Sequence, residues 1–178
     1  MQFRYSPLLH LPKVSLLIVQ LYSIKTAKKT SDDARQKVIT DTKTAYDAKM
    51  KSDVMYFAQV KAKEIFENRF TSVEKANNAI VIHFKLLQSL TPSTGFDALS
   101  NSAKVFEAFK GRADYNSVNC QGSFPMVDKN GNNFIQNVFV IELDRDTIDK
   151  TTFANIQPTG LIPLASIHNI RPELLDLG

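Results

Sequence analysis

The chain has 178 residues, of which 43% are hydrophobic and 22% charged, with only 6 Gly and 7 Pro. This composition excludes a disordered, collagen-like or low-complexity chain, and the length suits one hydrophobic core. The formal net charge of +4 is unevenly distributed, because residues 1–112 carry 18 Lys and Arg against 10 Asp and Glu, whereas residues 113–178 carry 4 against 8. The single cysteine, Cys120, excludes an internal disulfide and is compatible with a reducing compartment.

Residues 1–30 form a basic, apolar N-terminal segment, and no acidic residue precedes Asp32. The apolar run at 14–24 (VSLLIVQLYSI) is shorter than the roughly 20 residues that a membrane-spanning helix needs. A signal sequence would suit that length, but no small-residue cleavage pattern follows the run. Three interpretations stay open: a buried element of the fold, a leader sequence and a membrane anchor.

The cations of this segment form a candidate interaction patch, because clustered lysines attract anionic membranes and nucleic acid. The patch consists of Arg4, Lys13, Lys25, Lys28 and Lys29. Beyond it, aspartates interleave with the lysines, which dilutes the positive stripe.

Residues 31–178 predict a single α+β domain that opens with three consecutive helices, at about 31–70, 71–90 and 96–110. Ser31 can cap the first helix, and neither Gly nor Pro occurs between Ser31 and Pro92. The second helix rests on a capping-box pattern at Thr71 and Glu74. Its competitor is a buried strand over residues 79–84 (AIVIHF), which are apolar and β-branched.

The first predicted helix carries an incomplete apolar stripe, which we expect to pack on its own domain. The third carries a regular one, and Gly111 stands where a left-handed residue often ends a helix. The two stripes consist of Ile39, Tyr46, Met50, Val54, Phe57 and Ile65, and of Phe96, Leu99, Ala103, Phe106 and Phe109.

After Asp114 the apolar pattern changes to a period of two, which predicts an antiparallel sheet built around a 115–127/134–143 hairpin. The residues from Asp128 to Ile135 resemble the first positions of an EF-hand calcium loop. However, Asn133 stands where that loop needs Gly, and Phe139 where it needs Glu. Asn130-Gly131 is a strong hairpin-turn signal, so we interpret this segment as the turn.

Two groups of residues are candidates for chemistry. Glu142, Asp144 and Asp146 would share one face if the second hairpin strand continued through them, and such carboxylates could hold a divalent metal. Cys120, with His168 and Asn169, has the residue types of a thiol hydrolase, but the strand alternation places Cys120 on the apolar face as a small buried hydrophobe.

The chain contains none of the common nucleophile, phosphate-binding, dinucleotide-binding or zinc motifs. We therefore expect a non-enzymatic structural or assembly protein that acts through self-association or as a subunit of a larger complex, and we expect no cofactor and no small-molecule substrate. The alternative is peripheral binding to a membrane or to nucleic acid through the basic N-terminal region. A second alternative is a divalent-metal-dependent enzyme at the acidic residues 142–149.

Overall fold

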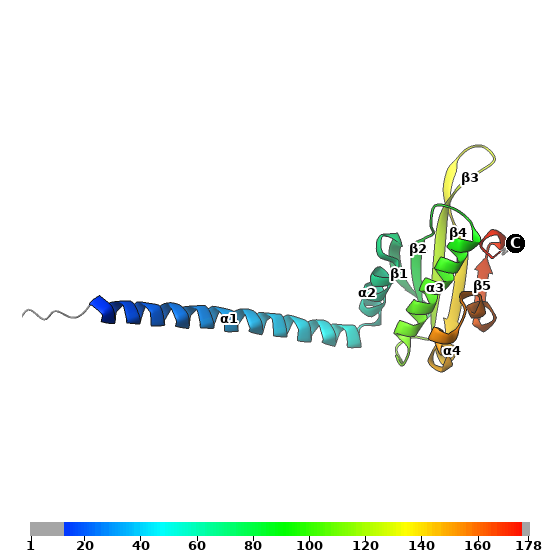
Figure 1. Ribbon diagram of the computed structural model, residues 1–178. Helices are drawn as coiled ribbons and strands as arrows, with labels where there is room; N and C mark the ends of the chain where they lie inside the picture. The colour runs from blue at the N-terminus through cyan, green and yellow to red at the C-terminus, as the bar shows by residue number, and fades with distance from the viewer. Residues whose placement is uncertain (1–12, 176–178) are drawn as a thin grey trace, which may run out of the picture. The chain divides into compact units, whose positions relative to one another are not determined.

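The computed structural model describes the backbone of residues 13–175 and the side chains of residues 20–175, and it has the α+β architecture expected from the sequence (Figure 1). Contacts divide the chain into two compact units, residues 1–48 (unit 1) and residues 49–178 (unit 2). The helices are α1 (Lys13–Ser52), α2 (Val54–Phe66), α3 (Pro92–Phe109) and α4 (Arg145–Lys150). The strands are β1 (Phe70–Ala76), β2 (Ala79–Lys85), β3 (Ser117–Val127), β4 (Asn133–Asp144) and β5 (Ile167–Ile170).

The helix predicted at 31–70 extends further toward the N-terminus and is divided near its middle. Helix α1 begins at Lys13, and Asp53 separates it from α2. Asp53 has an extended backbone, and its carboxylate accepts a hydrogen bond from the Tyr56 amide at 2.9 Å. Because this cap satisfies a free N–H at a helix start, it begins a new helix instead of continuing the old one.

The prediction of a helix at 71–90 is wrong, because this region contains the hairpin of β1 and β2. A two-residue turn, Asn77-Asn78, joins the strands, with φ angles of +50° and +67°. Asparagine tolerates this left-handed backbone better than most residues, and the turn's twist suits a hairpin. The β-branched residues at 80–82 favour the extended conformation, so the strand alternative was the correct one.

Helix α3 begins at Pro92, four residues before the predicted start. Proline suits the first turn of a helix, where no partner exists for its missing N–H. The helix ends at Phe109, and Gly111 has a φ of +76°, as the sequence predicted.

The predicted hairpin is confirmed as β3 and β4, which pair antiparallel from Ser117↔Asp144 to Val127↔Asn133. In the turn, the Asp128 carboxylate accepts hydrogen bonds at 2.8 Å from the amides of Asn130 and Asn132. Gly131 takes a φ of +85°. The oxygen atoms of Asp128 thus hold the turn, in agreement with a hairpin turn in place of a calcium loop.

The five strands form one sheet in the order β1-β2-β3-β4-β5. The sheet is mixed and not antiparallel throughout as predicted, because β2 and β3 are parallel neighbours, and α3 makes the crossover that a parallel pair requires. Helices α2 and α3 pack against the sheet, and Phe66 of α2 stacks on Phe84 of β2 with ring centroids 4.0 Å apart (Figure 1). Alternate residues of the strands bury one face of the sheet in this core: Ile80, Ile82, Phe84, Val118, Cys120, Phe139, Ile141 and Leu143.

Candidate functional site

The three acidic residues proposed for a metal do not form a ligand group. Strand β4 ends at Asp144, so Asp146 lies in α4 and leaves the face that it was expected to share. Among the side chains of residues 20–175, no group of three or more His, Cys, Asp or Glu is placed to hold a metal ion.

Each of these carboxylates instead has a partner of its own. Glu142 accepts a hydrogen bond from Asn119 at 2.7 Å, and Asp146 lies 3.9 Å from Lys150. Asp144 caps α4 by accepting hydrogen bonds from the Thr147 amide at 2.8 Å and its hydroxyl at 3.0 Å, and these bonds lower the pKa of Asp144. Each carboxylate therefore has a local partner, and Asp144 is the one that caps a helix.

Cys120 is fully buried in the core, as its alternation predicted, and burial raises the pKa of its thiol to about 12. His168 is exposed on β5, and strand β4 lies between the two residues. A protonated, inaccessible thiol is a poor nucleophile. The arrangement is that of a structural cysteine.

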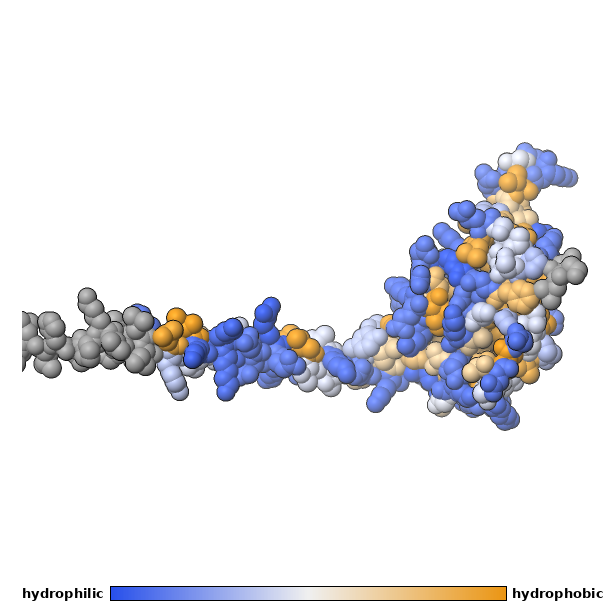
Figure 2. All heavy atoms as spheres, in the orientation of Figure 1, coloured by the Kyte–Doolittle hydropathy of each residue, from blue (hydrophilic) through white to orange (hydrophobic). Residues whose placement is uncertain are grey.

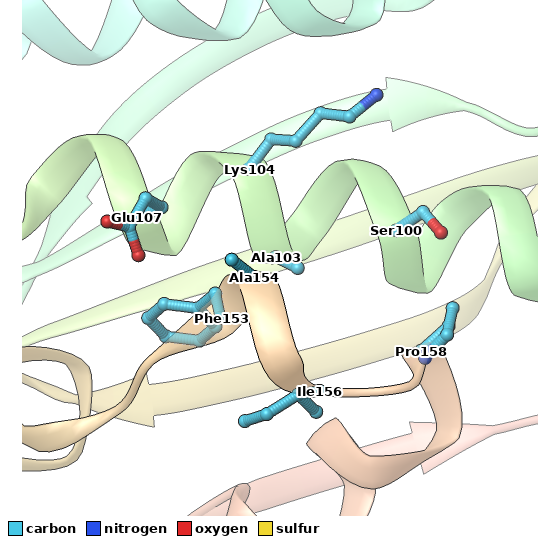
Figure 3. Close-up of a pocket in the computed structure, with 8 residues that line it drawn as sticks. All are labelled: Ser100, Ala103, Lys104, Glu107, Phe153, Ala154, Ile156 and Pro158. Carbon is cyan, nitrogen blue, oxygen red and sulfur yellow. The ribbon is translucent and has the colours of Figure 1, made fainter.

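A hollow of about 490 Å³ lies between α3 and the segment that follows α4 (Figure 3). Phe153, Ala103 and Ile156 give it an apolar lining, and Lys104 and Glu107 on α3 belong to its border. Lys104 donates a hydrogen bond to the side-chain oxygen of Asn101 at 3.1 Å. The hollow therefore offers mainly apolar contact, with one paired cation at its border.

The longest exposed surface in the described part of the chain belongs to α1. Every side chain from Gln20 to Lys49 is exposed. Four threonines along this stretch donate a hydrogen bond from the side-chain hydroxyl to the backbone carbonyl four residues earlier, so these hydroxyls have partners within the helix. No Gly or Pro lies between residues 13 and 52, which favours a continuous helix.

Apolar side chains occur in two groups along this helix, separated by a hydrophilic stretch (Figure 2). In the first group, Leu21 is 53% and Ile24 63% exposed, and Tyr22 lies beside them. In the second, Val38 is 64% and Ile39 60% exposed. We call these two groups the α1 apolar groups.

The stripe predicted on residues 39–65 is divided by Asp53. Val54 and Phe57, after the break, are buried in the core of unit 2, whereas Ile39 and Tyr46 are exposed. Leu21, Ile24 and Val38 are not part of the predicted stripe, although all three are more than half exposed on α1. The predicted stripe begins at Ile39, so it leaves out the apolar residues that precede it.

Only part of the predicted basic patch lies among the residues whose side chains the structure describes. Arg4 lies outside the described residues, and Lys13 is described only as the first residue of α1. Lys25, Lys28 and Lys29 are exposed on α1; Lys25 follows Ile24 directly, and the other two lie four and five residues beyond Ile24. Within the described part of the chain, no helix combines the length and the hydropathy that a bilayer crossing requires.

Comparisons of the chain with protein-family models, with curated proteins and with solved structures found no match.

Proposed function

We propose that this chain is a non-enzymatic structural or assembly protein in which α1 docks against another helix. The observation that carries the proposal is the exposure of the α1 apolar groups on a helix whose side chains are exposed from residue 20 to residue 49. Unit 2 would be the folded body that α1 attaches to the assembly.

Most helical stability in proteins comes from packing one face, because intrinsic propensity alone leaves an isolated helix marginal. Burying one Leu, Ile or Val side chain contributes about 1.5–3 kcal/mol. Docking through the two apolar groups would therefore stabilise α1 and remove its exposed hydrophobic side chains from water.

Concentration-dependent helicity and mass test this proposal. Circular dichroism and sedimentation velocity of the full chain should show helix content and mean mass rising together with concentration. A variant with Leu21, Ile24 and Val38 all changed to Ser should lose both effects. The matched control changes three exposed apolar residues of unit 2, Val127, Ile135 and Ile167, to Ser. A mass and a helicity that stay constant in the wild type, or that fall equally in both variants, would contradict docking through α1.

A second candidate function, binding to an anionic membrane surface, is favoured by one specific observation. Exposed Leu21, Tyr22 and Ile24 stand next to Lys25, Lys28 and Lys29 in a part of α1 without acidic residues. Apolar residues beside lysines suit a helix lying in a membrane interface, where each lysine near an anionic surface contributes about 1 kcal/mol.

Co-sedimentation with vesicles tests this second candidate. The chain should bind vesicles that contain phosphatidylserine and not neutral ones, and changing Lys25, Lys28 and Lys29 to Gln should weaken the binding. Binding to duplex DNA that shows the same lysine dependence, without vesicle binding, would favour the nucleic-acid alternative. Indifference to charge and to salt would contradict both.

A further inference from the structure

We propose that the edge of β4 at residues 133–137 binds an extended segment of another protein, which adds to the sheet as a strand and carries an acidic residue toward Arg171. The inference goes beyond the proposed function, because it concerns unit 2 and does not depend on α1. It is carried by backbone groups that face an open sheet edge, and by an apolar residue and a cation beside that edge.

The β3–β4 hairpin extends beyond the strands on either side of it (Figure 1). Strand β2 pairs with β3 only as far as Ser123, and β5 pairs with β4 only from Phe139 onward. We call residues 124–136 the hairpin arm. Among the described residues, no strand pairs with residues 133–137 on the side away from β3. A two-stranded ribbon is marginally stable by itself, so a third strand would stabilise the arm.

The backbone groups that face this open edge are identified by Pro125, which lies opposite Ile135. A hydrogen-bonded antiparallel pair exchanges two N–H···O bonds, and proline has no N–H, so this pair is of the other kind. The N–H and C=O of Ile135 therefore point away from β3. Those of Asn133, two residues earlier, point the same way. An added strand would meet donors and acceptors at the spacing of its own backbone.

The other open edges of the described sheet carry features that hinder strand addition. Strand β1 contains Glu74 and Lys75, and β5 has only four residues and is followed closely by Pro172. On the outer side of β3, Pro125 offers no donor. Charge, shortness and proline are the features by which natural sheets protect their edges. In contrast, neither a charged residue nor a proline occurs from residue 130 to residue 141, so the edge of β4 lacks this protection.

One face of the arm favours an apolar residue in the added strand. Ile135 is 74% and Val127 63% exposed. They lie on the same face, because directly opposite residues share a face and alternate residues return to it. An apolar side chain placed opposite Ile135 would cover part of this surface.

The other face places a cation beside the open edge. The amide of Arg171 donates a hydrogen bond to the Val138 carbonyl at 3.0 Å, so Arg171 lies where the open edge ends. Its Nη1 lies 4.0 Å from Sδ of Met126, on the face opposite Val127. Within the described part of the chain, no carboxylate forms an ion pair with Arg171. An acidic side chain of the added strand on this face would supply one.

The two faces together give the order of residues in the added strand. Antiparallel pairing is the more stable kind and places the N-terminal end of the segment beside Arg171. From that end, the residue opposite Gln136 is acidic, and the next, opposite Ile135, is apolar. The peptide acetyl-Thr-Glu-Val-Thr-Val-amide has this order, with its second valine opposite Asn133.

Titration of the isotope-labelled full chain with this peptide, followed by amide chemical shifts in NMR spectra, tests the proposal. A second peptide with Gln in place of Glu removes only the charge. Ile135→Pro removes the N–H that faces the open edge, whereas the bonds between β3 and β4 do not use that group. The matched control Val127→Pro removes an N–H from the protected side of β3. Arg171→Gln tests the acidic contact.

The expected result is a shift of the Asn133 and Ile135 amides on addition of the Glu peptide. Ile135→Pro should weaken binding by about tenfold, because a backbone acceptor of the peptide loses its donor, and Val127→Pro should leave binding nearly unchanged. Arg171→Gln should weaken binding of the Glu peptide by about fivefold and should not affect the Gln peptide.

Several results would overturn the proposal. These are unshifted amides at millimolar peptide, equal losses in the two proline variants, and an Arg171→Gln effect that is the same for both peptides. Arm amides that shift with protein concentration and not with peptide would place a second copy on this edge instead. If Ile135→Pro disorders the arm, the wild-type shifts and the Arg171→Gln variant still decide. None of these outcomes bears on docking through α1.

Discussion

Helices α1 and α2 follow each other in the chain and both carry apolar side chains, but they use them differently. In α2, Val54, Phe57 and Phe66 are buried against the sheet and α3. In α1, Leu21 and Ile24 are more than half exposed. The change from exposed to buried apolar side chains occurs at Asp53, the residue that caps α2.

This contrast separates two sources of helical structure. Helix α1 contains neither Gly nor Pro, but many of its residues are Val, Ile, Thr, Ser, Tyr or Asp, whose intrinsic helix propensity is lower, and its side chains from residue 20 to residue 49 are exposed. Helix α2 forms part of a core in which aromatic rings meet, as Phe57 does edge-on with Phe109 at 5.1 Å. Substitutions in unit 2 should therefore change folding stability, whereas substitutions in α1 should change association.

The largest expected effect is at the centre of the unit 2 core. Phe84 is fully buried, stacks on Phe66 and meets Phe139 edge-on at 5.9 Å. The substitution Phe84→Ala should lower the free energy of unfolding by about 3–5 kcal/mol, because it removes apolar contacts and leaves a cavity. Urea denaturation followed by near-ultraviolet circular dichroism measures the loss. Phe84→Leu is the control and should cost clearly less; equal losses would argue against a cavity effect.

The strength of local patterns explains which parts of the fold could be predicted from the sequence. Helix α3 and the β3–β4 hairpin have regular periods of 3.6 and two residues, with Gly111 and Asn130-Gly131 at their ends. For β1 and β2 two local signals conflicted, since Thr71 and Glu74 matched a helix start. The strand conformation of residues 79–85 is stabilised by pairing with both β1 and β3, and this tertiary pairing is not visible in the local sequence.

The candidate site was predicted only in part, for a related reason. Lys25, Lys28 and Lys29 were identified because charge needs no geometry to be recognised. The apolar stripe was extrapolated through Asp53, where the extended backbone ends the helical phase, so residues with different environments were joined. Exposure distinguishes a docking surface from a core face, and a single sequence does not contain it.

A smaller effect is expected at the start of α4, where Asp144 is the capping residue. Asp144→Ala should lower the free energy of unfolding by about 1 kcal/mol at neutral pH, because the Thr147 amide loses its acceptor. Asp144→Asn is the matched control, since asparagine also caps helices and should retain most of this stability.

The pH dependence of that cap follows from the direction of its pKa shift. Hydrogen bonds from the Thr147 amide and hydroxyl lower the pKa of Asp144 in the folded state, outweighing the effect of burial. The stabilisation is therefore present above the unfolded-state pKa of about 3.9 and is lost as pH falls through the lower folded-state pKa. The stability difference between wild type and Asp144→Asn should shrink over that acidic range. A difference that is constant with pH would show that the charge of Asp144 is not involved.

The β1–β2 turn should give an effect of similar or smaller size. Asn78 has a φ of +67°, so Asn78→Ala should lower the free energy of unfolding by about 1 kcal/mol, whereas Asn78→Gly should raise it by a few tenths. Asn130, in the other hairpin turn, is not among the residues with positive φ and provides the control. Thermal unfolding of the three variants measures the differences. Equal effects of alanine at both asparagines would argue against backbone strain as the cause.

The smallest expected change in folding stability is also the sharpest test of the comparison between the two helices. Changing Leu21, Ile24 and Val38 to Ser removes exposed side chains, and surface substitutions of this kind usually alter the free energy of unfolding by less than about 0.5 kcal/mol. Urea denaturation of unit 2, followed by near-ultraviolet circular dichroism at a protein concentration low enough to keep the chain monomeric, should therefore superimpose on the wild-type curve. The same variant should lose its concentration-dependent gain in mass. If the unfolding midpoint of unit 2 shifted as far as it does in Asp144→Ala, the α1 side chains would contribute to the folding stability of unit 2. The contrast between α1 and α2 would then be contradicted.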